Sequence, residues 1–402
     1  MLSMLRRVLG PRRKTILVAW ELGGGTGHVQ RLLSIVRELA AHDFRFVLAL
    51  RKRGGAEIVA RLLPQASILE APIWYPDPTI PAVNQGLVCN YPDILFRCGY
   101  DSPESLGPLV QGWHQLFWSA SPALVLCDHS PTAVLAAAGR VPVVHTGTGF
   151  TAPPSGQPFL TLHRAAALGA QEREALVLRS IQEVQSNLGA PVLNRVCDLW
   201  NSAESIACTW PELDPYASIR GEPAPGPVEA RPEPQPVVKN AAVFGYLAGE
   251  EPRVPGLLKS LAKAKVRCGI YVRNQTAECM AAAAGSTVQL YDAPQKLPGA
   301  LVNASAFLHH GGSTANAALA LGRPQFVAPR NLDQILIGEA VQKLGCGMTL
   351  DGLTADPGEA IRRVLLRGTY DKNVAAVAAR IAARPNVDVA KMIAQSCLKL
   401  LA

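Results

Sequence analysis

The first regular pattern in the chain is a strand-length apolar run, residues 15–20, which leads into a glycine-rich turn. After the turn, apolar residues recur at helical spacing on one face while the opposite face is polar. The apolar face consists of Val29, Leu32, Leu33, Val36 and Leu39, and the polar face of Arg31, Ser34, Arg37 and Glu38. Another apolar run follows at residues 46–50. Strand, helix and strand in this order predict a βαβ unit of a parallel sheet.

Similar runs recur in both halves of the chain. The first half continues with expected strands at residues 122–128, 141–145 and 205–209, and the second half restarts with expected strands at residues 241–246, 266–272, 286–290 and 307–309 and a short one after Pro324. Residues 221–236, between the halves, are rich in proline and show no periodicity, which is typical of an exposed linker. We therefore predict an α/β protein with two Rossmann-like domains, residues 1–220 and 239–402, joined by a Pro-rich linker at residues 221–238.

Composition narrows the class of protein. At 402 residues the chain is long enough for two domains, and 49% hydrophobic with 17% charged residues indicates a globular fold. Aromatic residues make up only 6% and do not alternate with basic ones, so a nucleic-acid partner is not expected. The nine cysteines are odd in number and form no Cys-x-x-Cys, which indicates neither a disulfide framework nor a zinc site and favours a reducing, cytoplasmic setting.

The net charge is +8, and part of it is concentrated near the amino terminus. The basic residues there are Arg6, Arg7, Arg12, Arg13 and Lys14. They are interpreted as a solvated tail, or as a peripheral contact with anionic lipid. No apolar stretch reaches the roughly 18 residues that span a bilayer, and no secretory leader is recognised.

The segment from His309 to Gln334 contains the clearest candidate for ligand chemistry. A strand ends at His309-His310, Gly311 and Gly312 form a turn, and a helix is expected to start at the hydroxyl-bearing Ser313-Thr314. A helix start offers unpaired N–H groups and a positive dipole end, which suit a phosphate group. His310 is expected to add an N–H or a positive charge. Asp333 and Gln334, about twenty residues later, are expected to bind sugar hydroxyls.

The glycine-rich turn of the first half, residues 23–27, leads into His28. It lacks the Gly-Lys-Ser/Thr of a Walker A loop. The expected strand at residues 122–128 ends in Asp128, and the carboxyl end of a parallel strand faces the ligand crevice. A carboxylate can orient an imidazole and stabilise its charged form, as a general base requires. The alternatives are that His28 and Asp128 only cap helices; His129 and His145 are further candidates for the partner of Asp128.

Together these motifs resemble GT-B glycosyltransferases of the UDP-glycosyltransferase type. The resemblance lies in His310-Gly311-Gly312, Gly322-Arg323-Pro324, the later Asp333-Gln334, and a Gly-x-x-Gly-His turn that ends at His28. It implies two Rossmann-like domains that face each other across a cleft, with a last helix near residues 387–401 crossing back to the first domain. One departure is that an acidic residue usual in the helix after the Gly-Gly turn is missing, so that either Asn316 replaces its ribose contact or the donor differs.

The resemblance implies a metal-independent, inverting transfer from a UDP- or dTDP-sugar to an acceptor hydroxyl of a small molecule or lipid. His28 is then the general base and Asp128 its partner. No cofactor is expected beyond the nucleotide-sugar co-substrate, and no metal, since Asp-x-Asp is absent. The expected donor-binding residues are Gly27, Gly245, Tyr246, His310, Gly311, Gly312, Ser313, Thr314, Asn316, Asp333 and Gln334.

Two alternatives remain open at this point. One is a nucleotide-sugar 2-epimerase, which needs acidic catalytic groups, and the other is a catalytically silent partner of a true transferase. The irregular, aromatic segment at residues 75–100, together with Trp113, Phe117 and Trp118, either lines an acceptor pocket or packs under a long loop.

Overall fold

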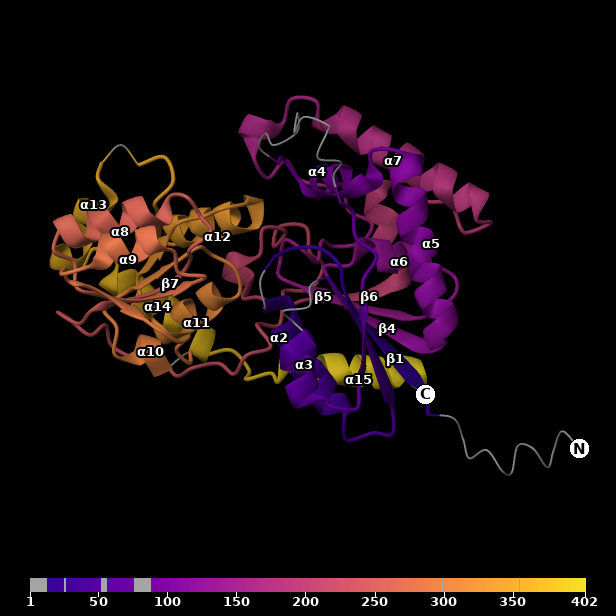
Figure 1. Cartoon of the computed structure of the whole chain (residues 1–402), viewed down its shortest axis with the longest axis horizontal. Coiled ribbons are helices and arrows are strands. Elements are labelled where there is room, and N and C mark those ends of the chain that lie inside the picture. The colour runs from indigo at the N-terminus through magenta and orange to yellow at the C-terminus, as the bar shows by residue number, and fades with distance from the viewer. Residues whose placement is uncertain (1–12, 25–26, 52–55, 76–87, 298, 354) are drawn as a thin grey trace, which may run out of the picture. The chain divides into compact units, whose positions relative to one another are not determined.

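The computed structural model describes residues 13–24, 27–51, 56–75, 88–297, 299–353 and 355–402. The chain forms two compact units (Figure 1). Unit 1 contains the chain up to Cys208 together with Ser218–Ala224 and Asp388–Ala402, and unit 2 contains Thr209–Ala217 and Pro225–Val387. The Pro-rich segment expected as a linker is thus divided between the units, and the chain first enters unit 2 at Thr209, well before that segment.

Unit 1 is built on a parallel six-stranded sheet with the strand order β3-β2-β1-β4-β5-β6. Its strands are β1 (Thr15–Trp20), β2 (Arg45–Leu50), β3 (Ser67–Glu70), β4 (Pro122–Asp128), β5 (Val143–Gly147) and β6 (Ala203–Ala207). Every residue of β1 is buried, because helices cover both faces of a parallel sheet, and this explains its uninterrupted apolar sequence. The register pairs Trp20 with Asp128, so the carboxyl ends of β1 and β4 are adjacent.

Helices cover both faces of this sheet. The helices of unit 1 are α2 (Gly27–Leu39), α3 (Ala56–Leu62), α4 (Tyr91–Leu95), α5 (Pro103–Ala120), α6 (Pro131–Ala137), α7 (Ala170–Asn187) and α15 (Val389–Leu401). Helix α15, at the end of the chain, packs beside α2 and against β4 and β5 (Figure 1). On the other face α6 contacts β4 and β5, and α5 packs on α6.

Unit 2 repeats the arrangement with the strand order β12-β11-β10-β7-β8-β9, again parallel throughout. Its strands are β7 (Val243–Ala248), β8 (Cys268–Arg273), β9 (Val288–Tyr291), β10 (Phe307–His309), β11 (Gln325–Val327) and β12 (Gly347–Thr349). The two sheets confirm the predicted fold class of two Rossmann-like α/β domains. Expected strand ends differ from the observed ones by at most two residues, and the edge strands β3 and β12 were not predicted because both are short.

The helices of unit 2 pack on alternate faces of its sheet, as the side chains of the central strand show. They are α8 (Val254–Lys263), α9 (Ala277–Ala283), α10 (Gly299–Val302), α11 (Thr314–Leu321), α12 (Leu332–Lys343), α13 (Pro357–Arg367) and α14 (Asp371–Ala382). Leu308 points into the core formed with α8, α9 and α13, which lie together in Figure 1, whereas its neighbour Phe307 packs toward α10 and α11.

The aromatic residues of the irregular segment are largely packing residues. Tyr91, Tyr100 and Trp113 are fully buried, and Tyr91 packs edge-on against Trp200 at 5.1 Å between ring centroids. Trp118, by contrast, is exposed. These positions favour the interpretation of aromatic packing under a loop; residues 76–87 lie outside the described residues.

The basic cluster near the amino terminus is described only in part, since Arg6, Arg7 and Arg12 lie outside the described residues. Arg13 forms an ion pair with Asp43 at 2.6 Å, and the amino group of Lys14 donates to the backbone oxygen of Leu401. Within the described ranges, no helix is both long and apolar enough to cross a bilayer.

Candidate functional site

His28 and Asp128 are hydrogen-bonded in the structure, although 100 residues separate them in sequence. His28 lies in the first turn of α2, directly after the exposed Gly27, and its Nδ1 is 2.8 Å from Oδ1 of Asp128 at the end of β4. With Nδ1–H donating to the carboxylate, Nε2 keeps its lone pair for accepting a proton. The two other candidates do not bond Asp128: Nδ1 of His145 bonds the hydroxyl of Ser205, and neither ring nitrogen of His129 has a hydrogen-bond partner among the described residues.

Arg31, which the sequence placed on the polar face of the helix, is buried rather than exposed to solvent. It lies one turn after His28, and its guanidinium donates to Oδ2 of Asp128. The expectation that the polar face is solvated was therefore wrong for Arg31. The spacing of apolar residues in a helix does not reveal that one of its arginines pairs with a buried acid on a distant strand. Sequence reasoning missed Arg31; its spacing of three from a candidate base was the available signal.

The charge state of Asp128 follows from these contacts. Burial by itself would raise the pKa of this carboxyl, but Arg31 and His28 outweigh burial through charge and hydrogen bonds and hold the pKa well below its usual range. Asp128 is therefore an ionised, fully buried carboxylate between two partners. A side-chain cap from Asp128 to α6 is not found; Ser130 occupies the N-cap.

Gly23 gives the imidazole of His28 its space. Its backbone has φ of +88°, and a Cβ atom there would lie 2.5 Å from Nε2 of His28 and 3.2 Å from Nδ1 of His129. Any side chain at residue 23 would collide with Nε2, the ring nitrogen that does not bond Asp128. The glycine is therefore required by close approach as well as by its backbone conformation.

Two further titratable groups are buried close to the hydrogen-bonded pair of His28 and Asp128, called the dyad below. The ring of His129 lies 5.7 Å from that of His28, and burial, followed by the charge of His28, lowers the pKa of His129 well below its ordinary value. Glu21, just after β1, accepts hydrogen bonds from the backbone and hydroxyl of Thr132, yet burial raises the pKa of Glu21 to about 7. Both groups are thus neutral or nearly so at slightly acidic pH.

In unit 2 the Gly-Gly turn connects β10 to α11 as predicted. Gly311 and Gly312 have φ of +104° and +87°, which only glycine adopts without strain. The N–H of Gly311 donates to Nδ1 of His309 at 2.9 Å. Ser313 and Thr314 follow at the start of α11. The turn also lies against α12, because a Cβ on Gly311 would be 3.0 Å from Cα of Gln334. The structure thus brings the Gly311-Gly312 turn close to Gln334, which lies more than twenty residues later in the sequence.

His310 does not carry the positive charge that the sequence suggested. Its Nδ1–H donates to the oxygen of Ala328 at 2.7 Å, and its Nε2 accepts the N–H of Ala248 at 2.9 Å. Burial lowers the pKa of His310 below its ordinary value and outweighs the bond to Ala328, which raises it. Both ring nitrogens are engaged and the imidazole is neutral, so His310 ties together the ends of β7, β10 and β11 and offers no spare N–H.

Asn316 is also occupied within unit 2. It is buried on α11, its amide oxygen accepts the hydroxyl of Thr209 and the N–H of Trp210, and its amide nitrogen donates to the oxygen of Ser313. The predicted ribose contact would require some of these bonds to break. The geometry therefore favours a structural role, in which Asn316 fixes the segment around Trp210 to α11.

The remaining expected donor groups fall into two sets. Asp333 and Gln334 lie half-buried in the first turn of α12, and Oε1 of Gln334 accepts the N–H of Arg330. Gly245 and Tyr246 were expected at the end of β7, but this strand continues to Ala248. Gly245 packs against Ile270, since its Cβ would lie 2.9 Å from that side chain, so it belongs to the sheet interior.

Sequence reasoning also missed an ionic cluster after β7. Glu250 pairs with Arg273, Glu251 pairs with Arg253 at 2.7 Å, and Arg330 lies 3.3 Å from Glu251. Arg330 and Arg253 both act electrostatically on His310, which explains in part why that imidazole stays neutral. The signal available in the sequence was the pair Glu250-Glu251 directly after a strand.

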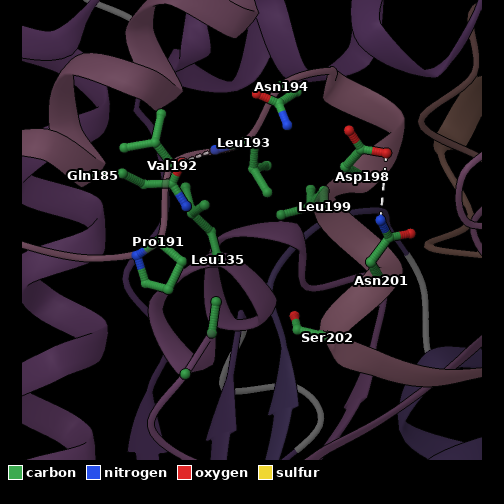
Figure 2. A pocket seen from close by; sticks show the side chains of 12 residues that line it. Leu135, Gln185, Pro191, Val192, Leu193, Asn194, Asp198, Leu199, Asn201 and Ser202 are labelled. Carbon is green, nitrogen blue, oxygen red and sulfur yellow. Dashed lines mark hydrogen bonds between the residues drawn. The ribbon is translucent and has the colours of Figure 1, made fainter.

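Unit 1 also contains a cavity of about 320 Å³ that is separate from the dyad (Figure 2). Its wall includes Leu135, Gln185, Leu193, Asn194, Asp198 and Asn201. The segments that form it precede β5 and β6, so it lies near the amino-terminal edge of these strands, whereas Asp128 ends β4 at the carboxyl edge. Within the described part of the chain, no group of three or more His, Cys, Asp or Glu side chains is placed to hold a metal ion.

Comparison with known proteins agrees with this architecture. Residues 296–400 match the family described as "Erythromycin biosynthesis protein CIII-like, C-terminal domain". No curated protein matches the sequence.

Several solved structures are similar over nearly the whole chain. The calicheamicin glycosyltransferase CalG4 is 20% identical, with 97% of this chain and 99% of that chain covered and a TM-score of 0.67. The glycotransferase of kitacinnamycin is 17% identical, with 98% and 100% covered and a TM-score of 0.63. The glycosyltransferase VinC, solved in complex with dTDP, is 14% identical, with 96% and 99% covered and a TM-score of 0.57. The chain is therefore a protein of the GT-B glycosyltransferase fold with an EryCIII-like carboxyl-terminal part, as its resemblance to the UDP-glycosyltransferase type predicted.

Proposed function

We propose that this chain is a metal-independent, inverting glycosyltransferase that moves a sugar from a UDP- or dTDP-sugar to an acceptor hydroxyl. The observation that carries the proposal is the hydrogen bond between His28 and Asp128 at the carboxyl ends of adjacent strands. A neutral imidazole that is oriented by a buried carboxylate is suited to general-base catalysis.

In the proposed reaction Nε2 of His28 accepts the proton of the acceptor hydroxyl. The acceptor oxygen then forms a bond to the anomeric carbon of the donor, and the bond from that carbon to the β-phosphate oxygen breaks. The nucleoside diphosphate leaves with the bonding electron pair. Attack opposite the leaving group inverts the configuration at the anomeric carbon, and no covalent enzyme intermediate forms.

Unit 2 is proposed to bind the donor. The start of α11 at Ser313 and Thr314 provides backbone N–H groups and the positive end of a helix for the diphosphate. Asp333 and Gln334 are proposed to bind the sugar, and the contact between Gly311 and Gln334 supports a single ligand that spans both elements. The dTDP bound by the structurally similar VinC supports a pyrimidine nucleotide as donor.

The acceptor is proposed to be a small molecule or lipid with a free hydroxyl. The names of the similar structures refer to transferases for calicheamicin and kitacinnamycin, which supports a small-molecule acceptor. All nine cysteines are free, and this supports the proposed cytoplasmic location.

The proposal is tested by incubating the protein with a panel of nucleotide sugars and measuring transfer or slow donor hydrolysis. We expect turnover with a UDP- or dTDP-sugar in the presence of a chelator, and its loss in His28→Ala with donor binding retained by calorimetry. Equal loss of turnover and donor binding would contradict the role of His28. Donor binding without any turnover in the wild type would favour a catalytically silent partner, and an isomerised donor sugar would favour an epimerase.

A further inference from the structure

Helix α2 holds both oxygens of the Asp128 carboxylate. His28 contacts Oδ1 and Arg31, one turn later, contacts Oδ2. The side chains of Asp128 and Arg31 are 0% and 3% exposed, whereas that of His28 is 15% exposed. Only the imidazole of this triad therefore reaches outward, and the ion pair behind it is closed to solvent.

The charges of the triad explain what the arginine adds. A buried carboxylate beside an imidazole, without a cation, would favour a proton on the imidazole, because an unpaired buried charge is very unfavourable. A protonated imidazole cannot act as a base. Arg31 carries a permanent positive charge, so Asp128 is already neutralised when His28 is neutral.

We propose that Arg31 is a positioning residue of the reaction, which keeps His28 in its neutral, proton-accepting form by neutralising Asp128 and fixing the plane of its carboxylate. The inference rests on the proposed function of His28 as general base. It predicts that the cationic charge of Arg31, and not merely its bulk, determines the pH range in which the protein is active.

The other groups around His28 do not replace this charge. From β1, Trp20 stacks on the imidazole at 5.6 Å and carries no charge. From the segment after β4, His129 is buried and neutral. Glu21 is buried after β1 and hydrogen-bonded to Thr132, and Lys391 and Lys399 on the adjacent helix α15 are exposed to solvent. Arg31 is thus the buried cation, among the described residues, that contacts Asp128 together with His28.

The first experiment compares pH–rate profiles of Arg31→Gln, Arg31→Lys and the exposed control Arg37→Gln on the same helix. In Arg31→Gln we expect the acidic limb of kcat to move up by about one pH unit, with kcat roughly fivefold lower at the original midpoint, approaching tenfold below it, and recovery at higher pH. The KM for the donor should stay unchanged. Arg31→Lys should restore the wild-type limb, and Arg37→Gln should match the wild type. A loss of kcat that is equal at every pH would overturn the proposal.

A second readout does not need turnover, so it separates this proposal from the proposed function. Diethyl pyrocarbonate reacts with neutral imidazole, and peptide mass spectrometry reports modification at His28 alone. The half-maximal pH of this reaction should be about one unit higher in Arg31→Gln than in the wild type. If the wild type shows no glycosyl transfer but this shift appears, the role of Arg31 stands and the proposed reaction does not.

A third comparison covers the case in which Arg31→Gln does not fold. Replacing both partners of a buried ion pair is far less destabilising than replacing one. The double variant Arg31→Gln/Asp128→Asn is therefore compared with Asp128→Asn, in which the arginine keeps its charge but no longer faces a carboxylate at residue 128. His28 should be modified down to a lower pH in Asp128→Asn than in the double variant, and identical profiles would overturn the proposal.

Discussion

Asn316 and Trp210 bind each other through two reciprocal hydrogen bonds. The amide oxygen of Asn316 accepts the backbone N–H of Trp210 at 2.9 Å, and the indole N–H of Trp210 donates to the backbone oxygen of Asn316 at 3.1 Å. Gly226 packs on the same indole, since a Cβ there would lie 2.7 Å from the ring. A segment that follows the last strand of unit 1 is thereby built into the core of unit 2.

This pairing predicts that Asn316→Ala destabilises unit 2. The substitution leaves the N–H of Trp210 and the hydroxyl of Thr209 buried without a partner, which should lower the free energy of unfolding by about 2 kcal/mol. Chemical denaturation measures the effect, with the exposed Asn303→Ala as control. Donor affinity of the folded variant should change less than threefold. A tenfold loss of affinity with unchanged stability would instead support the ribose contact expected from the sequence.

Gly23→Ala should inactivate the protein while its neighbour tolerates the same change. The new Cβ would lie 2.5 Å from Nε2 of His28, and the positive φ adds about 1 kcal/mol of backbone strain. We expect kcat to fall about 100-fold or more, since His28 must move, with donor affinity retained. The control is Gly24→Ala, where no atom of the described residues, apart from its chain neighbours, lies within 4 Å of the added Cβ. Full activity in Gly23→Ala would show that Nε2 does not need this space.

His310→Phe should weaken donor binding by a factor that does not depend on pH. The imidazole is neutral and joins Ala248 to Ala328, so its loss loosens the strand ends that present the Gly-Gly turn. Calorimetry with dTDP or UDP at pH 6 and pH 8 should give about the same ratio of wild-type to variant affinity, on the order of tenfold. The exposed His42→Phe serves as control. A ratio that grows markedly as the pH falls would indicate a charged His310 at the phosphate.

Glu21→Gln should change how stability depends on pH. Burial raises the pKa of Glu21 from 4.5 to about 7 in the folded state, so between these values the folded protein keeps a proton that the unfolded chain has lost. Stability linked to Glu21 is therefore present below pH 4.5 and is lost as the pH rises through about 7. Glu21→Gln does not lose stability in this way, because a glutamine side chain does not titrate.

The free energy of unfolding of Glu21→Gln, relative to the wild type, should thus rise by about 3 kcal/mol between pH 4.5 and pH 8. Thermal or chemical unfolding at both pH values measures the difference, and the exposed Glu38→Gln on α2 is the matched control. A constant difference between variant and wild type would show that Glu21 is ionised throughout this range.

The sequence by itself determined the architecture and the main chemical groups. Strands that are buried on both faces must be apolar throughout, so runs such as Thr15–Trp20 are recognisable without a structure. A Gly-Gly turn before a helix and a histidine after a glycine-rich turn are local patterns, and they correctly indicated where residues 28 and 311–314 would lie.

Only the tertiary structure decided which charges those groups carry. Arg31 is buried because Asp128, 97 residues away, holds its guanidinium, and no helical pattern contains that contact. His310 is neutral because it is buried, and because Ala248 at the end of β7 and Ala328 just after β11 engage both of its nitrogens. Protonation and free hydrogen-bonding capacity depend on partners brought together from distant parts of the chain, so they could be assigned only from the tertiary structure. Secondary structure depends mainly on neighbours in sequence, so it could be predicted from the sequence alone.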